Sequence, residues 1–323
     1  MHRLIAILIL LSAAPAMAAD ITDATGRTVA IPDSPQRVLP AGPPAAALLA
    51  AIAPAQMLGF PGPVSESARA LLAPAAGGKD SVPRLTGGGD MHDAIEPLHP
   101  DLIIDYGNTS PRYQQLARDT QQKTGIPTLL FDGSLDQIPV VARTLGRILH
   151  QPDQAEAVAR FADAVLALPL AATSHPRVLY ARGEDGLLVA APDTDVTAVF
   201  ARLGWQVVAP DGNGTFRRAT IEAIRTLDPD IIVLANPEAR SLLTTQPWTS
   251  LRAVRESRAF IAPSEPFGWI EDPPSINRLL GLAWLQGADP RTLAALFNTI
   301  VYHHVLTPAQ LAAVAGTTPS FKP

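Results

Sequence analysis

Two side chains with distinct chemistry stand close behind apolar runs of the sequence. Tyr106 follows the run at residues 102–105, and Arg182 comes two residues after the run at 177–180. Both runs are predicted to be strands, and in α/β proteins ligands bind beyond the carboxyl ends of the strands. Tyr106 and Arg182 are therefore candidates for touching a ligand, and the guanidinium would suit an anionic chelate.

Each candidate also has a plainer interpretation. Tyr106 can simply cap the edge of a sheet, and Arg182 can pair with the acidic residues two and three positions later. Arg84 precedes a glycine-rich loop and can bind an anion, or be held at the surface by Asp80 or Asp90. The sequence leaves these alternatives open.

A different kind of site is possible at residues 40–44, which read PAGPP and include Pro43. This loop has no charged side chain, but it leads into a predicted helix. Free backbone amides at a helix start can hold an oxyanion, which is the physical route to a ligand of the molybdate type.

Histidines and enzyme motifs give little support for a metal site or for catalysis. After residue 18 the histidines are His92, His99, His150, His175, His303 and His304. They do not follow successive predicted strands, so a bare metal site is not expected, and the adjacent pair at the end is interpreted as a surface or packing feature. The sequence has no HExxH, GxSxG or P-loop motif and no cysteine nucleophile. An exported hydrolase that uses scattered carboxylates is the remaining enzyme alternative.

The elements that would position these side chains are organised around a phrase that occurs twice. Residues 93–104 read DAIEPLHPDLII and residues 222–233 read EAIRTLDPDIIV. Proline disfavours helical geometry in the residue before it, so His99 and Asp228 should end short helices. The apolar runs that follow suit strands buried on both faces of a parallel sheet. The repeat predicts two similar α/β lobes.

Composition limits the class of protein and its compartment. Hydrophobic residues make up 47% and charged residues 17% of 323, as in globular proteins, and the net charge is -5 with no basic block, which excludes a typical nucleic-acid binder. Arg3, an apolar stretch and the pattern Ala16-Met17-Ala18 indicate a secretory signal peptide, cleaved after Ala18 or, alternatively, after Ala19. Without any cysteine, the exported chain has neither disulfides nor a lipid-attachment site, so a periplasmic location is expected.

A long helix is predicted to connect the two lobes. The apolar face from Val158 to Leu166 continues without Gly or Pro between Asp153 and Leu168, a span of about 24 Å at 1.5 Å per residue. Asp153 and Glu156 stand as a capping pair at its start. The expected organisation is a signal peptide (1–18), an N-terminal lobe (19–136), connecting helices (137–174) and a C-terminal lobe with terminal helices (175–323). Each lobe should be Rossmann-like, with a parallel sheet between helices.

These features together resemble the helical-backbone (class III) periplasmic solute-binding proteins of ABC importers. The similarity rests on the order of DATGRTVAIPDSPQRV, the two repeated phrases, the connector helix and GWIEDPPSINRLLGLAWL. It implies a binding protein rather than an enzyme, without a cofactor, which captures a ferric siderophore, haem or cobalamin between its lobes. In some members of the class the ligand is molybdate or tungstate. The implied partner is a dimeric ABC permease in the inner membrane, and the protein is expected to be a monomer.

The resemblance also implies roles for particular residues. Similar proteins place an aromatic side chain at the position of Tyr106 and often an indole at that of Trp269, although plain packing is the alternative for Trp269. In similar proteins an acidic residue at the start of each phrase docks onto permease arginines, and the matching positions are Asp93, which departs from the usual glutamate, and Glu222. The candidate ligand-binding residues are Pro43, Arg84, Tyr106, Asn108, Arg182 and Trp269.

Overall fold

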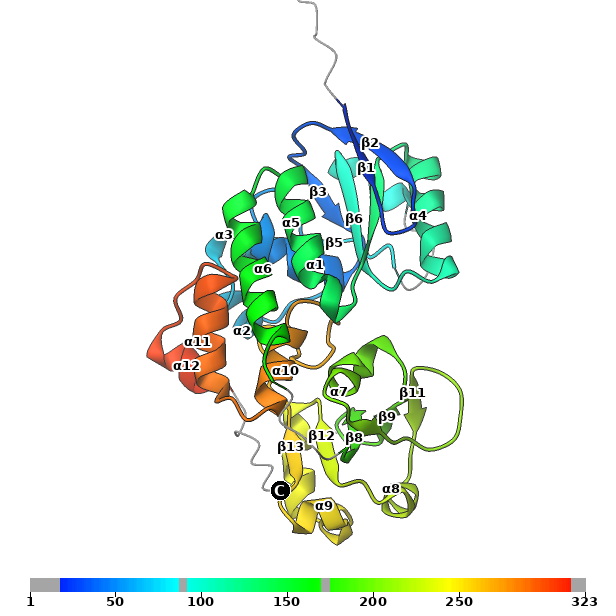
Figure 1. The fold of residues 1–323 in the computed structure, drawn as a ribbon, viewed down its shortest axis with the longest axis vertical. Coiled ribbons are helices and arrows are strands. Elements are labelled where there is room, and N and C mark those ends of the chain that lie inside the picture. Colours follow the sequence, from blue (N-terminus) through cyan, green and yellow to red (C-terminus); the bar gives the residue numbers. More distant parts are fainter. Residues whose placement is uncertain (1–17, 87–91, 170–174, 315–323) are drawn as a thin grey trace, which may run out of the picture.

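The computed structural model describes residues 18–86, 92–169 and 175–314, which form two α/β lobes lying one above the other along the long axis (Figure 1). The glycine run at 87–89 and most of the proposed signal peptide lie outside the described residues. The fold is the one expected from the repeated phrase: two Rossmann-like lobes and a long helix between them.

The N-terminal lobe is built on a three-stranded parallel sheet in the order β3-β6-β7. Its central strand is buried from Leu102 to Tyr106, which explains the continuous apolar run. The strands of this lobe are β1 (Ala18–Thr22), β2 (Thr28–Pro32), β3 (Val38–Pro40), β4 (Phe60–Pro61), β5 (Ser81–Val82), β6 (Leu102–Gly107) and β7 (Thr128–Asp132). Its helices are α1 (Pro43–Ile52), α2 (Glu66–Ala70), α3 (Pro74–Gly77), α4 (Pro111–Thr124) and α5 (Ile138–Ile148), with 3-10 turns at His92–Ala94, Glu96–Leu98 and Leu135–Gln137.

The C-terminal lobe has a mixed sheet. Strand β8 lies parallel to β10 and β12, and β12 to β13, whereas β9 runs antiparallel to both β8 and β11. The strands are β8 (Arg177–Arg182), β9 (Leu188–Ala190), β10 (Gln206–Val207), β11 (Phe216–Arg218), β12 (Ile231–Leu234) and β13 (Ala259–Ile261). The helices are α7 (Ala198–Arg202), α8 (Ile221–Leu227) and α9 (Arg252–Arg255), with 3-10 turns at Asp195–Thr197, Pro237–Thr244 and Trp248–Ser250. The prediction of parallel strands therefore holds for β8, β10, β12 and β13 but not for β9 and β11.

Both copies of the repeated phrase end their helices as predicted. His99 follows the 3-10 turn Glu96–Leu98 with φ 43°, and Asp228 follows α8 with φ 41°. The left-handed conformation stops the helix and is tolerated by Asp and His better than by most residues. The chain then passes through proline and enters a buried strand.

The aspartate of each phrase holds the neighbouring strand in place, which is β3 in the N-terminal lobe and β8 in the C-terminal lobe. The Asp101 carboxylate accepts a hydrogen bond from the backbone N–H of Arg37 at 3.0 Å, and Asp230 accepts one from the N–H of Arg177 at 2.9 Å. Each arginine side chain donates in return to the carbonyl of the left-handed residue, at 3.0 and 3.2 Å. In each lobe the phrase thus forms the same hydrogen bonds between two neighbouring strands.

The connector helix is α6 (Pro152–Leu166), close to the predicted span. Its predicted cap is wrong: Gln151 occupies the N-cap position and no side chain caps the helix. Proline at the first helical position removes one N–H that would need a partner, so less is required of a cap. Glu156 instead accepts hydrogen bonds from Arg143 of α5 at 2.8 Å and from Arg160 at 2.9 Å.

The terminal helices α10 (Arg278–Leu285), α11 (Pro290–Ile300) and α12 (Pro308–Ala313) return to the connector and the N-terminal lobe (Figure 1). Phe161 of α6 packs edge-on against Phe297 of α11, with ring centroids 5.3 Å apart. Gln310 donates a hydrogen bond to the carbonyl of Ala70 in the N-terminal lobe at 2.6 Å. The end of the chain therefore braces the connector, and the boundary expected at residue 175 stays a prediction.

Candidate functional site

A cleft between the lobes consists of two adjoining cavities of about 830 and 670 Å³. The N-terminal lobe contributes the loops after β6 and β7 and the start of α1, and the C-terminal lobe contributes the end of β8, α7 and the segment before α10. The residues that line both cavities are Pro43, Arg84, Arg182, Glu271, Asp272 and Pro273. The site thus lies at the carboxyl ends of the central strands, as the α/β rule predicts.

Five of the six candidate ligand-binding residues line the larger cavity: Pro43, Arg84, Tyr106, Asn108 and Arg182. Trp269 lines only the smaller cavity, and its side chain is 0% exposed. The indole Nε1 donates to the carbonyl of Glu265 at 3.1 Å. The expected open indole face is therefore not present in this structure, because the ring belongs to the packed interior. Ligand contact by each of the six stays a prediction.

A buried arginine forms part of the floor of the cleft. Arg278, the first residue of α10, is 2% exposed and donates hydrogen bonds to the carbonyls of Ser275 (3.1 Å) and Gly133. Among the residues that the structure describes, no carboxylate lies within 4.0 Å of its guanidinium. Burial lowers the pKa of Arg278, because a charged group is desolvated there. Its direct hydrogen-bond partners in the protein are neutral carbonyls, while the charges of Asp195 and Asp132, which line the same cavity, favour its charged form from a greater distance.

The phenol of Tyr106 lies next to this arginine. Tyr106 is 1% exposed, and its hydroxyl is buried without a well-aligned hydrogen bond from a described residue. Burial raises the pKa of Tyr106 to about 12, and the positive charge of Arg278 opposes that rise. The hydroxyl stays protonated and has donor and acceptor capacity for a group that enters the cleft.

Arg182 is positioned by an aromatic ring and a carboxylate. Its guanidinium lies over the ring of Phe216, 3.7 Å from the centroid, and its Nη1 is 3.7 Å from Oε1 of Glu271. The alternative partners predicted from sequence do not hold it: Asp185 pairs with Arg218 instead. Its side chain is 39% exposed, so part of the guanidinium remains accessible in the cleft.

Two carboxyl groups in the cleft are held partly neutral by burial. Burial raises the pKa of Glu271 to about 7, and the negative charge of Asp272 adds to the effect. Burial likewise raises the pKa of Asp105 to about 6, against a hydrogen bond that its carboxylate accepts from the N–H of Tyr106 at 2.9 Å. The Tyr180 hydroxyl donates to Glu271 at 3.3 Å. Near neutral pH Glu271 is therefore partly protonated, which reduces the negative charge that an anionic ligand meets in the cleft.

We expect the free energy of unfolding to fall as the pH rises, because of Glu271. The unfolded chain loses this proton near pH 4.5, whereas the folded chain keeps it to about pH 7, so the folded state binds more protons between these values. The free energy of unfolding should decrease over that window, by at most about 3 kcal/mol, and stay low above it. Glu271→Gln should flatten the decrease and be more stable than the wild type at pH 8.

Urea unfolding at pH 5 and pH 8 measures this difference. Glu238→Gln on the exposed turn Pro237–Thr244 is the control and should match the wild type at both values. Asp105 titrates in the same range and leaves a residual slope in the Gln variant. An equal decrease in Glu271→Gln and wild type would contradict the prediction.

The helix start proposed for an oxyanion offers few donors. The first two helical residues of α1 are Pro43 and Pro44, which have no N–H, and the N–H of Ala46 already bonds to the carbonyl of Gly42 at 3.1 Å. At this terminus only Gly42 and Ala45 can supply a further amide. An oxyanion held by several backbone amides is not favoured by this geometry.

Metal ligands do not gather among the described residues, where no group of three or more His, Cys, Asp or Glu side chains can hold an ion. His150 contacts the carbonyl of Asp33 at 2.7 Å, and His175 contacts that of Gly204 at 2.7 Å. The side chain of His92 lies outside the description. The histidines whose contacts are known therefore serve local structure.

Sequence reasoning missed the acidic residues and the two arginines contributed by the C-terminal part of the chain. Asp195 accepts a hydrogen bond from Asn108 at 2.6 Å, which links the two lobes across the cleft. Arg202 lies 3.7 Å from Asp136 of the other lobe. Glu271 and Arg278 both fall within the segment GWIEDPPSINRLLGLAWL, which was used only to recognise the overall pattern. The charged residues that stand near the two prolines of this segment were the signal in the sequence that could have indicated these site residues.

The two candidate docking residues occupy matching places at the starts of the repeated phrases. Asp93 lies in the 3-10 turn His92–Ala94 and Glu222 in the first turn of α8, and both are exposed. Neither lines the ligand cleft. A role in docking is compatible with this placement and stays a prediction.

Two lobes around a polar cleft, with side chains from both lobes at the strand ends, define a protein that holds a small ligand between its lobes. The profile of the family described as periplasmic binding protein matches residues 46–266, more than half of the chain, and the protein belongs to that family. Members of this family are substrate-binding proteins of ABC transporters rather than enzymes, and they work with membrane permeases. No helix among the described residues has the length and apolar character needed to cross a membrane.

Several solved structures share the fold. An ABC transporter solute binding protein from Sulfurospirillum deleyianum is 20% identical with a TM-score of 0.80, over 91% of this chain and 98% of that one. The molybdate-bound binding protein MolA from Haemophilus influenzae is 18% identical (TM-score 0.67; 90% and 99% covered). A protein of an Fe3+-hydroxamate transport system from Saccharomonospora viridis is 20% identical (TM-score 0.58; 82% and 96% covered). A search of curated proteins found no match by sequence. These likenesses establish the fold and not the ligand.

Proposed function

We propose that this protein captures a metal chelate with an anionic group, such as a ferric siderophore, haem or cobalamin, and delivers it to an ABC permease dimer. The observation that carries the proposal is Arg278, a buried cation in the floor of the cleft without a carboxylate partner among the described residues. Burying a charge is costly unless it is paired. A negatively charged group on the ligand would supply the missing partner.

The size and chemistry of the cleft support a chelate over a bare ion. The larger cavity, at about 830 Å³, lies within the range of pockets for organic ligands of drug size, roughly 300–1,000 Å³. Tyr113 and Arg182 line the same cavity as Arg278 and provide aromatic and cationic surface. A chelate carries its own ligands to the metal, so the protein needs no cluster of its own.

Molybdate or tungstate is the second candidate, supported by the likeness to a molybdate-bound structure. A tetrahedral oxyanion would use Arg278 but would fill little of the cleft. It would also find only the amides of Gly42 and Ala45 at the start of α1. The geometry therefore favours the chelate.

An exported form of the protein agrees with the start of the described chain. Strand β1 begins at Ala18 and pairs Ala19 with Ile31 of β2. Cleavage after Ala18 would leave this pairing intact from Ala19 onward. We propose on this basis, and on the family, that the mature protein works in the periplasm.

Titration of tryptophan fluorescence tests the proposal. Ferric siderophores, haem, cobalamin and molybdate are added separately, and native mass spectrometry reports the mass of each complex. One-to-one binding of a chelate, recovered chemically unchanged, is the expected result. Binding of molybdate or tungstate alone would show that the ligand is an oxyanion and not a chelate. Conversion of any compound to a product would favour an exported enzyme.

We expect the lobes to move only modestly on binding. Helix α6 spans about 22 Å without an interior break, and its hydrogen bonds resist bending. The Asn108–Asp195 bond and a 2.8 Å bond from Ser67 to Glu265 already link the lobes. Small-angle scattering should show a change in radius of gyration of no more than about 1 Å, in a total of about 20 Å for a compact chain of this length. Contraction by several ångströms would show that the connector acts as a hinge.

A further inference from the structure

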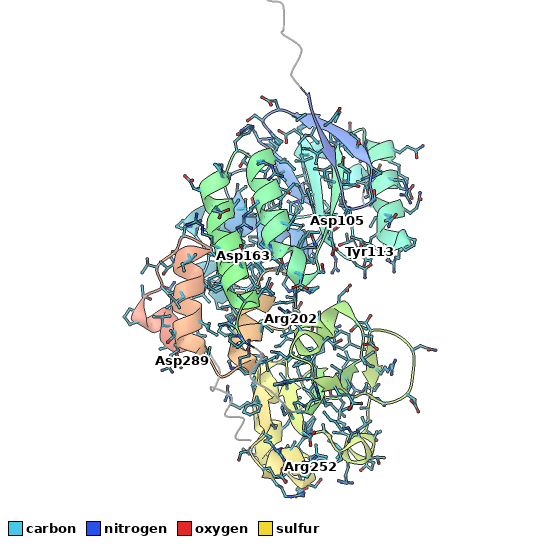
Figure 2. All side chains as sticks on the ribbon, in the orientation of Figure 1. Asp105, Tyr113, Asp163, Arg202, Arg252 and Asp289 are labelled. Atoms are coloured by element: carbon cyan, nitrogen blue, oxygen red, sulfur yellow. The ribbon has the colours of Figure 1, made fainter. Side chains whose placement is uncertain are left out.

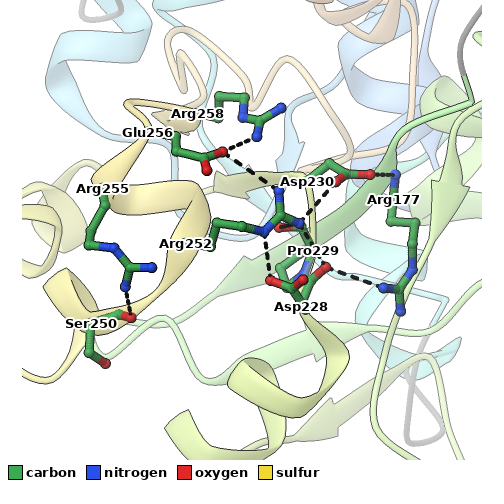
Figure 3. Close-up of polar contacts among 9 residues, drawn as sticks. All are labelled: Arg177, Asp228, Pro229, Asp230, Ser250, Arg252, Arg255, Glu256 and Arg258. Carbon is green, nitrogen blue, oxygen red and sulfur yellow. Dashed lines mark hydrogen bonds and ion pairs between the residues drawn. The ribbon is translucent and has the colours of Figure 1, made fainter.

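A third cavity, of about 360 Å³, lies at the far end of the C-terminal lobe, at the amino ends of β8 and β12 (Figures 2 and 3). The charged residues that line it are Arg225, Asp228, Arg252 and Arg255. Neither of the two cavities of the ligand cleft contains these residues. The pocket is therefore a separate, mainly cationic feature of a protein whose net charge is -5.

The acidic residues around this pocket are already used by one arginine. Arg252 lies 2.8 Å from Asp228, 3.0 Å from Asp230 and 3.6 Å from Glu256 (Figure 3). Glu256 is also paired with Arg258. Arg252 is thus paired with all three carboxylates, and Glu256 is shared with Arg258.

Arg225 and Arg255 are left without a carboxylate. Both are exposed, and both contact Ser250: Arg225 donates to its hydroxyl at 2.8 Å and Arg255 to its carbonyl. Within the described ranges of the chain, no carboxylate lies within 4.0 Å of either guanidinium. One serine thus positions two unmatched cations, each with further N–H donors, at the mouth of one pocket.

The pocket adjoins the candidate docking residue of its lobe. Glu222 and Arg225 are three residues apart on α8 and therefore share one side of the helix. In the N-terminal copy of the phrase the position of Arg225 is taken by Glu96, which is exposed. The C-terminal lobe therefore presents both charges where the N-terminal lobe presents only negative ones.

We propose that the Arg225–Arg255 pocket receives a carboxylate side chain of the membrane permease, beside the contact made by Glu222. The inference rests on the proposed function, because it assumes an importer as the partner. Two guanidinium groups fixed at one mouth suit the paired oxygens of a carboxylate, and charge complementarity of this kind sets orientation and encounter rate. The difference between the lobes makes the contact specific to the C-terminal one.

The test compares two double charge reversals for binding to the source cell's importer in nanodiscs of zwitterionic lipid. R225E/R255E should weaken binding at least about tenfold, whereas R118E/R291E, with the same change in charge on exposed residues elsewhere, should weaken it less than about twofold. R225Q/R255Q, which removes the charge without reversing it, should fall between them. Thermal unfolding and titration with haem, a ferric siderophore and cobalamin show whether the fold and the cleft are intact.

Equal effects of the two reversals would overturn the inference, and so would an R225Q/R255Q protein that binds the importer like the wild type. Vesicles that contain anionic phospholipid but no protein are the second probe. If they bind the wild-type protein but not R225E/R255E, the pocket recognises lipid phosphate and the permease assignment is wrong. A wild-type protein that binds neither a chelate nor the importer would instead overturn the proposed function itself.

Discussion

Replacing Arg278 by glutamine should weaken chelate binding at least about 30-fold, which corresponds to about 2 kcal/mol. The guanidinium is buried in the cleft floor and fixed by the carbonyls of Gly133 and Ser275, so it is already oriented before the ligand arrives. An interaction between such a group and an anionic ligand is screened little by solvent. The measurement is a fluorescence titration with whichever of haem, ferric siderophore or cobalamin binds the wild type.

Stability has to be followed in the same variant, because Arg278 also bridges two parts of the fold. Loss of its hydrogen bonds leaves two carbonyls without their donor, while loss of the charge removes a desolvation cost, so the two effects oppose each other. Titration well below the unfolding temperature separates binding from folding. Arg118→Gln on the exposed side of α4 is the matched control and should bind like the wild type. A folded Arg278→Gln protein with unchanged affinity would show that the guanidinium is structural only.

Much of this site could be predicted because it depends on local rules. Proline after His99 and Asp228 ends two helices, the apolar runs that follow become buried strands, and the loops after those strands form the cleft. Tyr106 and Asn108, which line the cleft, were singled out in this way, and Arg182 was singled out from the end of a separate predicted strand, β8. Helix α6 was placed within two residues at each end because its apolar face is regular. Local periodicity and chain stiffness are properties of the sequence itself.

The rest depends on contacts between distant segments. Arg278 appears in the sequence as an ordinary polar position near the start of a terminal helix, and only the return of α10 to the N-terminal lobe brings it to Gly133. The sequence places Trp269 in a loop that could present an indole face to a ligand, yet packing against the core buries the residue completely. The antiparallel strand β9, which lies between β8 and β11, was also missed, because a strand of three residues in a short hairpin shows no clear periodicity in the sequence. Burial and pairing of this kind are decided by tertiary packing.

The second large effect is expected on transport rather than on binding. Asp93→Ala combined with Glu222→Ala should lower uptake about tenfold or more while leaving ligand affinity unchanged, since neither residue lines the cleft. An exposed ion pair contributes only about 0.2–1 kcal/mol by itself. Two such contacts on lobes held by one stiff helix act together, because forming the first already orients the second.

The single variants should not be equal. Glu222→Ala is expected to slow uptake more than Asp93→Ala, because the shorter side chain of Asp93 reaches less far and the exposed Glu96 lies in the same copy of the phrase. Uptake is measured in vesicles that carry the importer, with ligand binding determined in parallel. The control is Asp211→Ala combined with Asp153→Ala, which removes two exposed carboxylates from surfaces outside the cleft and should leave uptake unchanged. If the Asp93 and Glu222 double variant also transports normally, both residues are ordinary carboxylates at the starts of their helices, favoured there by the helix dipole.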